Sequence, residues 1–387
     1  MDDALKNGLL PEGLRDGLPP RAHGREMIVR QLQDCFHANG YELVAPPLVE
    51  FEAGQRGRLD AGQGNSSDAF RLLDPASQKT LIVRSDITRQ VARIATTRLS
   101  DTLRPLRLAY TGSALRTRGT QLQPSRQVRQ VGIELIGPEG PAAARELAQV
   151  IAMAFDLVGV EDLTFDLAFP GFIPTLCTDL ALSKEQSAQV TAALDDKDAA
   201  GLSDLPGEAQ QLFQNLLQAV GSPAQVLSAV GVLKLPSKAS ALWTKAAQLV
   251  EVFSAVVGAE RLHIDPGEVH GFSYQAGWAL SVFSSGTRGE LGKGGAYVLS
   301  GPGTQEAAQG FTFYPDVFAD KAPLSAPRQK ICVPSKVETH EILALQTEGY
   351  VVVRALDANE TLEDQAAQMG CQALYKDGAV TALKTLA

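Results

Sequence analysis

The stretch that decides the fold is Arg126–Gly137, which reads RQVRQVGIELIG. Side chains alternate between the two faces of a β-strand, so this stretch predicts a strand with one apolar and one polar face. The apolar face carries Val131, Ile133 and Leu135, and the polar face carries Gln130, Gly132 and Glu134. The polar face is either the wet outside of a sheet or the floor of a binding site.

The preceding stretch, PLRLAYTGSALRT at 105–117, also has the texture of a strand, and only the loop RGTQLQPS separates the two. A connection this short predicts an antiparallel hairpin rather than a crossover. Gly112 and Arg116 share a face of the first strand. We expect Gly112 and Gly132 to leave space above the sheet for a small ligand. A solvated sheet face shows the same alternation.

Elements on the N-terminal side fit around this hairpin. Residues 21–40 predict an amphipathic helix that ends at Gly40, with an apolar stripe of Ile28, Leu32, Cys35 and Phe36. The strand that follows contains Pro46 and Pro47, which an edge strand tolerates. Residues 70–84 predict a second hairpin, which turns at Asp74–Pro75. A helix then begins with Ser85 or Asp86 as its N-cap.

Residue composition and hydrophobic pattern divide the rest of the chain into regions. A helix is expected near 141–158 and a strand at 163–169, and strand texture returns between about 271 and 318. We predict four parts: a core of residues 1–177, a helical insertion at 178–259, the second part of the core at 260–322, and a small C-terminal α/β domain at 329–387.

Composition bounds the class of protein. With 387 residues the chain has room for a substantial core. Its net charge of −9 argues against a large nucleic-acid surface. The four cysteines form no C-x-x-C pair, which favours free thiols over disulfides or a zinc site. Without an apolar leader or a long apolar run, we expect a soluble cytoplasmic protein.

Three other motifs leave their chemistry open. Asp86 and Thr88, at the start of a helix, either receive a ligand ammonium group or cap the helix. His263 and His270 lie seven residues apart, a spacing that fits no common metal site. The stretch GELGKGG resembles a phosphate-binding loop, but its glycine spacing is wrong and Lys293 is followed by Gly294 rather than Ser or Thr.

Taken in order, these motifs resemble the class II synthetase fold of histidyl-tRNA synthetase. The resemblance spans about Leu9 to Phe318 and rests on LPEGLRD, GYELVAPPLVEF, VRSDITRQVAR, YTGSALRT, RQVRQVGIELIG, HGFSYQAG, GGAY and GFTFYPDVF. It implies an α+β fold in which an antiparallel sheet is flanked by helices.

The resemblance also implies a use for the polar face, as the floor of an amino-acid pocket. Asp86, Thr88 and Gln130 would meet the ligand's ammonium end, and Glu134 would face an imidazole. Tyr274 and Tyr297 would wall the cavity, and Arg116 stands where the family grips a phosphate of ATP. Together these residues form the expected histidine-binding set: Asp86, Thr88, Arg116, Gln130, Glu134, Tyr274 and Tyr297.

The sequence departs from a working synthetase at charged positions. Val317 replaces the arginine of the last motif, and His270 replaces the arginine of the tyrosine motif. Ala296 and Val298 replace the Arg and Asp expected around Tyr297. Because adenylate formation needs fixed guanidinium groups around the triphosphate, no amino-acid activation is expected. Ser273 and Gln275 suggest that the imidazole side is rebuilt.

This combination resembles the regulatory subunits of ATP phosphoribosyltransferase, paralogues of histidyl-tRNA synthetase. The resemblance implies a noncatalytic subunit that activates a short catalytic subunit and carries feedback inhibition by histidine. A homodimer within a larger hetero-oligomer is expected, with no cofactor of its own and magnesium only at the partner's active site. Two alternatives stay open: a pseudo-synthetase that binds tRNA, which a salt-sensitive tRNA shift would reveal, and an active synthetase, which amino-acid-dependent pyrophosphate exchange would reveal.

Overall fold

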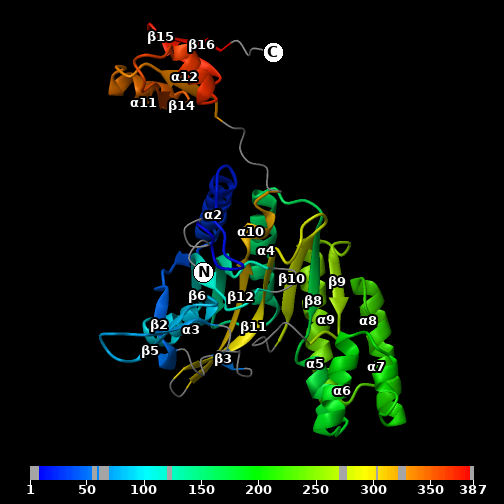
Figure 1. Ribbon diagram of the computed structural model, residues 1–387. Helices are drawn as coiled ribbons and strands as arrows, with labels where there is room; N and C mark the ends of the chain where they lie inside the picture. The colour runs from blue at the N-terminus through cyan, green and yellow to red at the C-terminus, as the bar shows by residue number, and fades with distance from the viewer. Residues whose placement is uncertain are drawn as a thin grey trace. The chain divides into compact units, whose positions relative to one another are not determined.

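The computed structural model describes residues 8–54, 59–60, 69–119, 124–269, 277–301, 304–320 and 328–383. The chain divides into two compact units, Met1–Pro323 and Leu324–Ala387 (Figure 1). Their boundary falls within the Pro-marked stretch of residues 319–329. Among the described helices, none is long and apolar enough to cross a membrane.

A nine-stranded sheet forms the centre of the larger unit. Its strand order is β1-β6-β7-β12-β11-β10-β8-β9, and β3 also pairs with β11. The strands are β1 (Glu42–Leu43), β3 (Leu59–Asp60), β6 (Leu106–Leu115), β7 (Gln127–Ile136), β8 (Leu163–Ala168), β9 (Leu262–Asp265), β10 (Ala279–Ser284), β11 (Gly292–Gly301) and β12 (Thr304–Phe313). Neighbours from β6 to β8 are antiparallel, and the outermost pairs, β1–β6 and β8–β9, are parallel. The predicted hairpin and the predicted α+β fold are confirmed.

Strands that follow β1 in the sequence form a second, three-stranded sheet. It contains β2 (Val49–Phe51), β4 (Arg71–Leu73) and β5 (Thr80–Val83) in the order β2-β5-β4. A short 3-10 helix, η1 (Glu52–Gly54), follows β2. The hairpin predicted around Asp74–Pro75 is therefore confirmed as β4 and β5.

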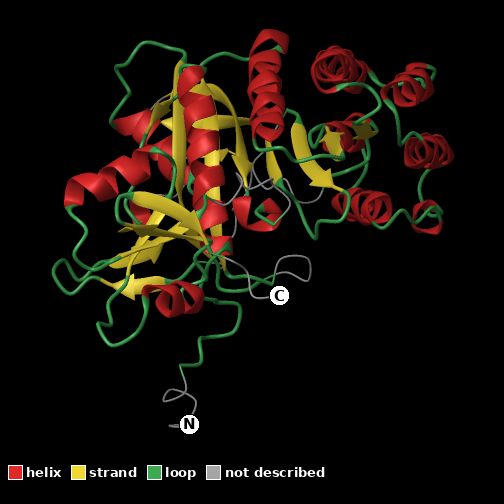
Figure 2. Cartoon of the chain, turned by 90° about the horizontal axis from the view of Figure 1, so that it is seen from above, coloured by secondary structure: helices red, strands yellow, loops and turns green. Residues whose placement is uncertain are grey.

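Helices cover both faces of the large sheet (Figure 2). On one face, α2 (Arg21–Ala38) and α4 (Pro141–Leu157) pack with Val131 and Ile133 of β7 in the main hydrophobic cluster. On the other face, α3 (Thr88–Thr97) packs with Ile136 of β7 and Tyr297 of β11 in a second cluster. Both faces of β7 are thus covered, which places its polar side chains inside the protein.

The stripe predicted for the first long helix is confirmed. Ile28, Leu32, Cys35 and Phe36 are all buried in α2. The helix ends at Ala38, and Gly40 follows with a φ of +81°. That left-handed backbone conformation suits glycine, which explains the stop.

The predicted N-cap of α3 is wrong. The helix begins at Thr88, and its N-cap is Ile87, which has no side-chain cap of its own. A side chain from the neighbouring strand takes over that role, because Gln130 Oε1 accepts a hydrogen bond from the Ile87 N–H at 3.0 Å. Asp86 Oδ1 accepts a longer one from the Thr88 N–H at 3.3 Å.

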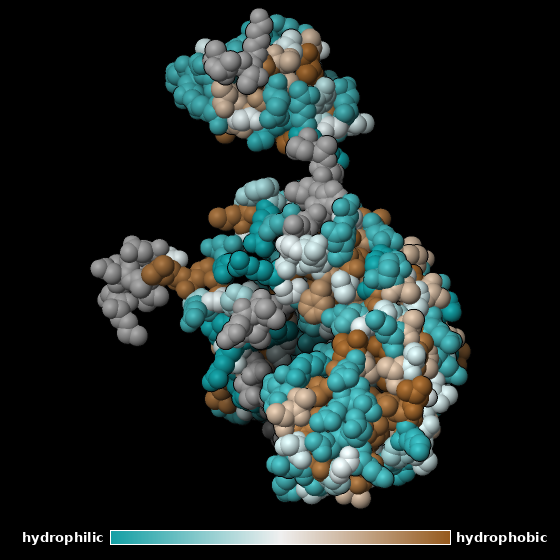
Figure 3. Space-filling model, turned by 90° about the vertical axis from the view of Figure 1, so that its right-hand side faces the viewer, coloured by the Kyte–Doolittle hydropathy of each residue, from teal (hydrophilic) through white to brown (hydrophobic). Residues whose placement is uncertain are grey.

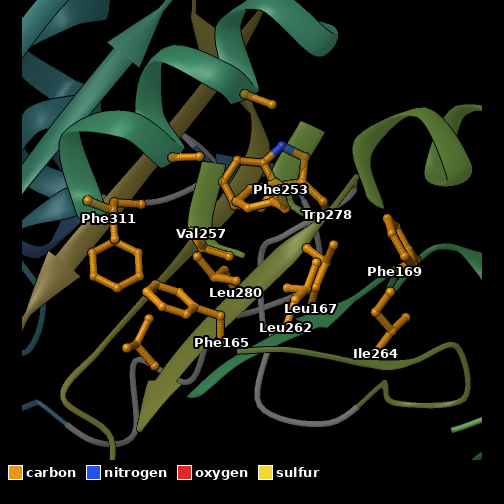
Figure 4. Packing of buried hydrophobic residues seen from close by; sticks show 14 of the residues in the cluster. Phe165, Leu167, Phe169, Phe253, Val257, Leu262, Ile264, Trp278, Leu280 and Phe311 are labelled. Atoms are coloured by element: carbon orange, nitrogen blue, oxygen red, sulfur yellow. The ribbon is translucent and has the colours of Figure 1, made fainter. Parts of the chain in front are cut away.

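Between β8 and β9 the described chain consists of helices: α5 (Phe172–Asp179), α6 (Lys184–Asp195), η3 (Ala200–Leu202), α7 (Gly207–Gln218), α8 (Pro223–Gly231) and α9 (Ser237–Val257). Their apolar faces join the core of the sheet, as Figure 4 shows for Phe253 and Val257 of α9, which lie near Trp278 beside β10. The rings of Phe253 and Trp278 lie 5.0 Å apart at 63°. On the face of the larger unit in Figure 3, hydrophilic and hydrophobic side chains are mixed.

The smaller unit contains β13 (Lys330–Val333), α11 (Thr339–Thr347), β14 (Val351–Arg354), α12 (Leu362–Gln368), β15 (Ala373–Lys376) and β16 (Ala379–Ala382). Its sheet has the order β14-β13-β15-β16, with β13 parallel to both neighbours. The expected alternation of strands and helices is confirmed, and β16 adds an antiparallel edge strand. All four cysteines of the chain are free and buried, as predicted.

Candidate functional site

The polar face of β7 is an interior surface. Gln130 and Glu134 are each only 1% exposed. A wet sheet face would leave these side chains in water, so that alternative is excluded. Buried polar groups need partners, and the partners of these two residues define the site.

The expectation that Gly112 and Gly132 leave room for a ligand is wrong. A Cβ placed on Gly112 would overlap the guanidinium of Arg84, and one on Gly132 would overlap the ring of Tyr110. Arg84 occupies its space because its Nε donates to the Ser113 carbonyl at 2.7 Å and its Nη1 to the Pro46 carbonyl at 3.0 Å. The two glycines therefore accommodate the protein's own side chains.

The hollow lies farther along the sheet, over β12 and β11. It has an empty volume of about 190 Å³, part of it open to solvent. Its lining residues are Thr88, Glu134, Lys293, Gly294, Gly295, Tyr297, Gly310 and Thr312. The strand register explains the set, because Glu134, Gly310 and Gly295 lie side by side on β7, β12 and β11. Two glycines next to a buried acid leave the floor as bare backbone.

Glu134 is the buried acid of this pocket. Its Oε2 accepts a hydrogen bond of 2.6 Å from the hydroxyl of Tyr297. Burial raises the pKa of Glu134 to about 8, although the hydrogen bond from Tyr297 opposes that shift. At neutral pH the unliganded pocket therefore holds mainly a neutral carboxyl group, ready to ionise beside a cation.

A chain of hydroxyl groups runs beside the carboxyl. The Tyr110 hydroxyl lies 3.1 Å from Thr88 Oγ1 and 2.6 Å from Thr312 Oγ1. All three side chains are buried. The chain links the start of α3 to β6 and β12, which holds one wall of the pocket in place.

A positively charged side chain also lines the pocket. Lys293 extends from the same face of β11 as Gly295 and Tyr297, and its side chain is 32% exposed. The Tyr314 phenol contributes most to raising the pKa of the Lys293 ammonium group, and Arg116 opposes it. Lys293 was missed as a site residue, although the alternation Lys293, Gly295, Tyr297 is a sequence signal for a shared strand face.

The structure brings together only part of the predicted set. Thr88, Glu134 and Tyr297 line the pocket. Asp86 and Gln130 are not among the lining residues. They lie at the start of α3, where Gln130 Nε2 donates a hydrogen bond to Asp86 Oδ1 at 3.1 Å. Arg116 follows the end of β6, near enough to Lys293 to affect its pKa. Tyr274, with His270, Ser273 and Gln275, lies outside the described residues.

Two of the positions that depart from a synthetase, Val317 and Ala296, make apolar packing contacts. Val317 lies in α10 (Pro315–Phe318), and both Val317 and Ala296 of β11 pack against the main cluster. The neighbouring Asp316 accepts hydrogen bonds from Arg25 Nη1 at 3.0 Å and from the Arg129 N–H at 2.7 Å. These contacts fasten α10 to α2 and β7.

No group of three or more His, Cys, Asp or Glu side chains suited to a metal ion occurs within the described part of the chain. That the chain needs no cofactor stays a prediction.

Comparison with known proteins identifies relatives along nearly the whole chain. The family model for histidyl-tRNA synthetase matches residues 13–317. An ATP phosphoribosyltransferase regulatory subunit of Rhodospirillum centenum is 40% identical, over 96% of this chain and 95% of the relative. The protein of that name from Paramagnetospirillum magneticum is 39% identical, over 98% and 99%.

Solved structures share the fold. An ATP phosphoribosyltransferase regulatory subunit/histidyl-tRNA synthetase from Bacillus halodurans superposes with a TM-score of 0.79 at 21% identity, over 95% of this chain and 97% of the other. A histidyl-tRNA synthetase from a Nostoc species gives a TM-score of 0.73 at 15% identity, over 97% and 95%. At these identities the likeness concerns the fold alone.

Proposed function

This chain belongs to the family of ATP phosphoribosyltransferase regulatory subunits, and we propose on that basis that it activates a short catalytic subunit and transmits feedback inhibition by histidine. The observation that carries the proposal is the pocket around Glu134, which keeps a buried acid and a bare backbone floor. The partner would condense ATP with phosphoribosyl pyrophosphate, and histidine would be the effector.

The pocket's lining supports an amino-acid effector. It includes both Glu134 and Lys293, which suits a ligand with an ammonium group and a carboxylate.

A noncatalytic role is supported by what stands at the charged positions of a synthetase. Val317 and Ala296 pack into the apolar core, and Asp316 is held by Arg25. At these positions a triphosphate would contact apolar groups, and a carboxylate that already accepts hydrogen bonds, instead of guanidinium groups.

We also propose a homodimer through the strand region around β2. Phe51 of β2 and Leu72 of β4 are opposite Leu81 of β5 in the small sheet. Phe51 is 45% exposed and Leu72 50% exposed. This Phe51–Leu72 patch gives a second copy of the chain an apolar surface to cover.

The test is an assay of the short catalytic subunit with and without this chain while histidine is titrated. We expect the chain to raise the catalytic rate and to confer inhibition by histidine. Glu134→Gln should weaken that inhibition about tenfold or more but keep the activation. Lys245→Met, on the exposed face of α9, is the control and should behave as the wild type. If sensitivity to histidine is the same with and without the chain, the proposal is wrong.

A further inference from the structure

We propose that Lys293 binds the carboxylate of the amino-acid effector and so makes the pocket selective for a free amino acid. The inference rests on the proposed function and deepens it. It assigns a role to the lysine of GELGKGG, a stretch that fails as a phosphate loop.

The first support is the position of Lys293 on the sheet. Lys293 pairs with Thr312 of β12, and Gly295, two residues along the same face, pairs with Gly310. Gly310 in turn pairs with Glu134 of β7. Because two strand spacings of about 4.8 Å separate β7 from β11, the two backbones are about 10 Å apart. Side chains from both strands line the same hollow.

Gly310 gives the Glu134 side chain the room to reach the hollow. A Cβ on Gly310 would overlap the carboxyl group of Glu134, so that group extends from β7 over β12. It meets the hydroxyl of Tyr297, which belongs to β11 itself. The acid and the lysine thus border one hollow, in which no side chain from Gly294, Gly295 or Gly310 intervenes.

Groups of both signs surround Lys293: Tyr314, Glu290 and Asp86 raise the pKa of its ammonium group, and Arg116 lowers it. Nζ of Lys293 lies 3.9 Å from Glu290 Oε2, which is too long for a hydrogen bond. Glu290 Oε1 accepts a 2.7 Å hydrogen bond from the Ser281 hydroxyl. The ammonium group of Lys293 therefore keeps donors for a ligand, and Arg116 adds a second positive charge nearby. Glu134 lines the same hollow and can ionise beside a cation, so the pocket suits a ligand that carries both an ammonium group and a carboxylate.

The alternative is that Lys293 only balances the charge of Glu290. Ligand chemistry separates the two roles, because L-histidine and L-histidinol share the imidazole and the ammonium group, but only histidine has a carboxylate. A lysine that merely neutralises Glu290 would affect both ligands alike.

The experiment is calorimetric titration of L-histidine and L-histidinol into the full-length chain. The variants are Lys293→Met and Lys293→Arg, with Lys245→Met as the matched control for loss of one surface ammonium group. Thermal unfolding of each protein monitors folding. We expect Lys293→Met to weaken histidine binding about 10- to 100-fold and histidinol binding less than threefold. Lys293→Arg should recover most of the affinity for histidine.

The outcomes separate the two proposals. If the wild type binds histidine and Lys293→Met binds it equally well, or loses both ligands to the same extent, the role of Lys293 is refuted and the histidine pocket stands. If Lys293→Met does not fold, Lys293→Gln takes its place, and a ratio of histidine to histidinol affinity equal to that of the wild type refutes the role. If the wild type binds no histidine, both proposals fall.

Discussion

Glu134 combines two properties that rarely occur in one residue. It is 1% exposed, and it belongs to a strand whose other face is packed with apolar side chains. Such an acid is costly to ionise, so its proton is retained to about pH 8. The Tyr297 hydroxyl keeps it hydrogen bonded in either state.

We predict that Glu134 makes stability fall as pH rises. Below the ordinary pKa of 4.5, the acid is protonated in the folded and unfolded chains alike. Between 4.5 and about 8 only the unfolded chain releases the proton, so the free energy of unfolding declines, and above 8 it levels off. Glu134→Gln cannot ionise and should be more stable than the wild type at pH 8 by a few kcal/mol, because each pH unit between the two pKa values costs the wild type about 1.4 kcal/mol.

Urea unfolding of both proteins at pH 5, 6.5 and 8 measures that difference. Glu268, whose pKa burial raises to about 7, changes the absolute values but is common to both proteins and cancels. A difference that is the same at all three pH values would contradict the assignment.

At the residue scale, the sequence predicts the site incompletely. Alternation along residues 126–137 places Glu134 on a polar strand face, the family resemblance adds Tyr297, and both line the pocket. It does not reveal that Gly132 lies under the Tyr110 ring, because that contact depends on how β6 pairs with β7. Lys293 escapes for the same reason, since only the pairing of β11 with β12 and of β12 with β7 brings it to the hollow that Glu134 also lines.

At the element scale, we predict that Gly132→Ala disturbs the packing of β6 on β7. The new methyl group would overlap the Tyr110 ring, whose hydroxyl joins Thr88 to Thr312. Forcing a methyl group into such a packed site typically costs about 1–3 kcal/mol. Urea unfolding should show that loss. Gly231→Ala, at the end of α8 with no atom within 4 Å of the new Cβ, should be neutral or stabilising, and an equal loss in both variants would contradict the argument.

Most helices and strands follow from the local sequence pattern, and the start of α3 is an exception. The predicted stripe and stop of α2 match because both depend on neighbours within the helix. The start of α3 does not, because its cap comes from Gln130, 43 residues beyond Ile87. A capping partner supplied by another strand leaves no trace in the residues next to the helix.

For the whole molecule, we predict that Phe51→Glu dissociates the proposed homodimer. A charge in the middle of a covered apolar patch loses its hydration, so association should weaken at least tenfold. Light scattering across a dilution series measures the change in mass. Val232→Glu, at an 80% exposed position after α8, is the control and should leave the dimer unchanged. A wild type that is monomeric at all concentrations would refute the dimer.

The two edge strands of the large sheet, β1 and β9, limit how another chain can pair with this sheet. On one side, β1 has two residues and is soon followed by Pro46 and Pro47, neither of which has an amide hydrogen to donate. On the other, Ile264 of β9 already exchanges backbone hydrogen bonds with Gly221. Neither margin offers a long template on which a foreign strand could align. Another subunit that binds at either of these two margins must therefore rely on the fit of side chains across surfaces, where point changes can tune affinity one contact at a time.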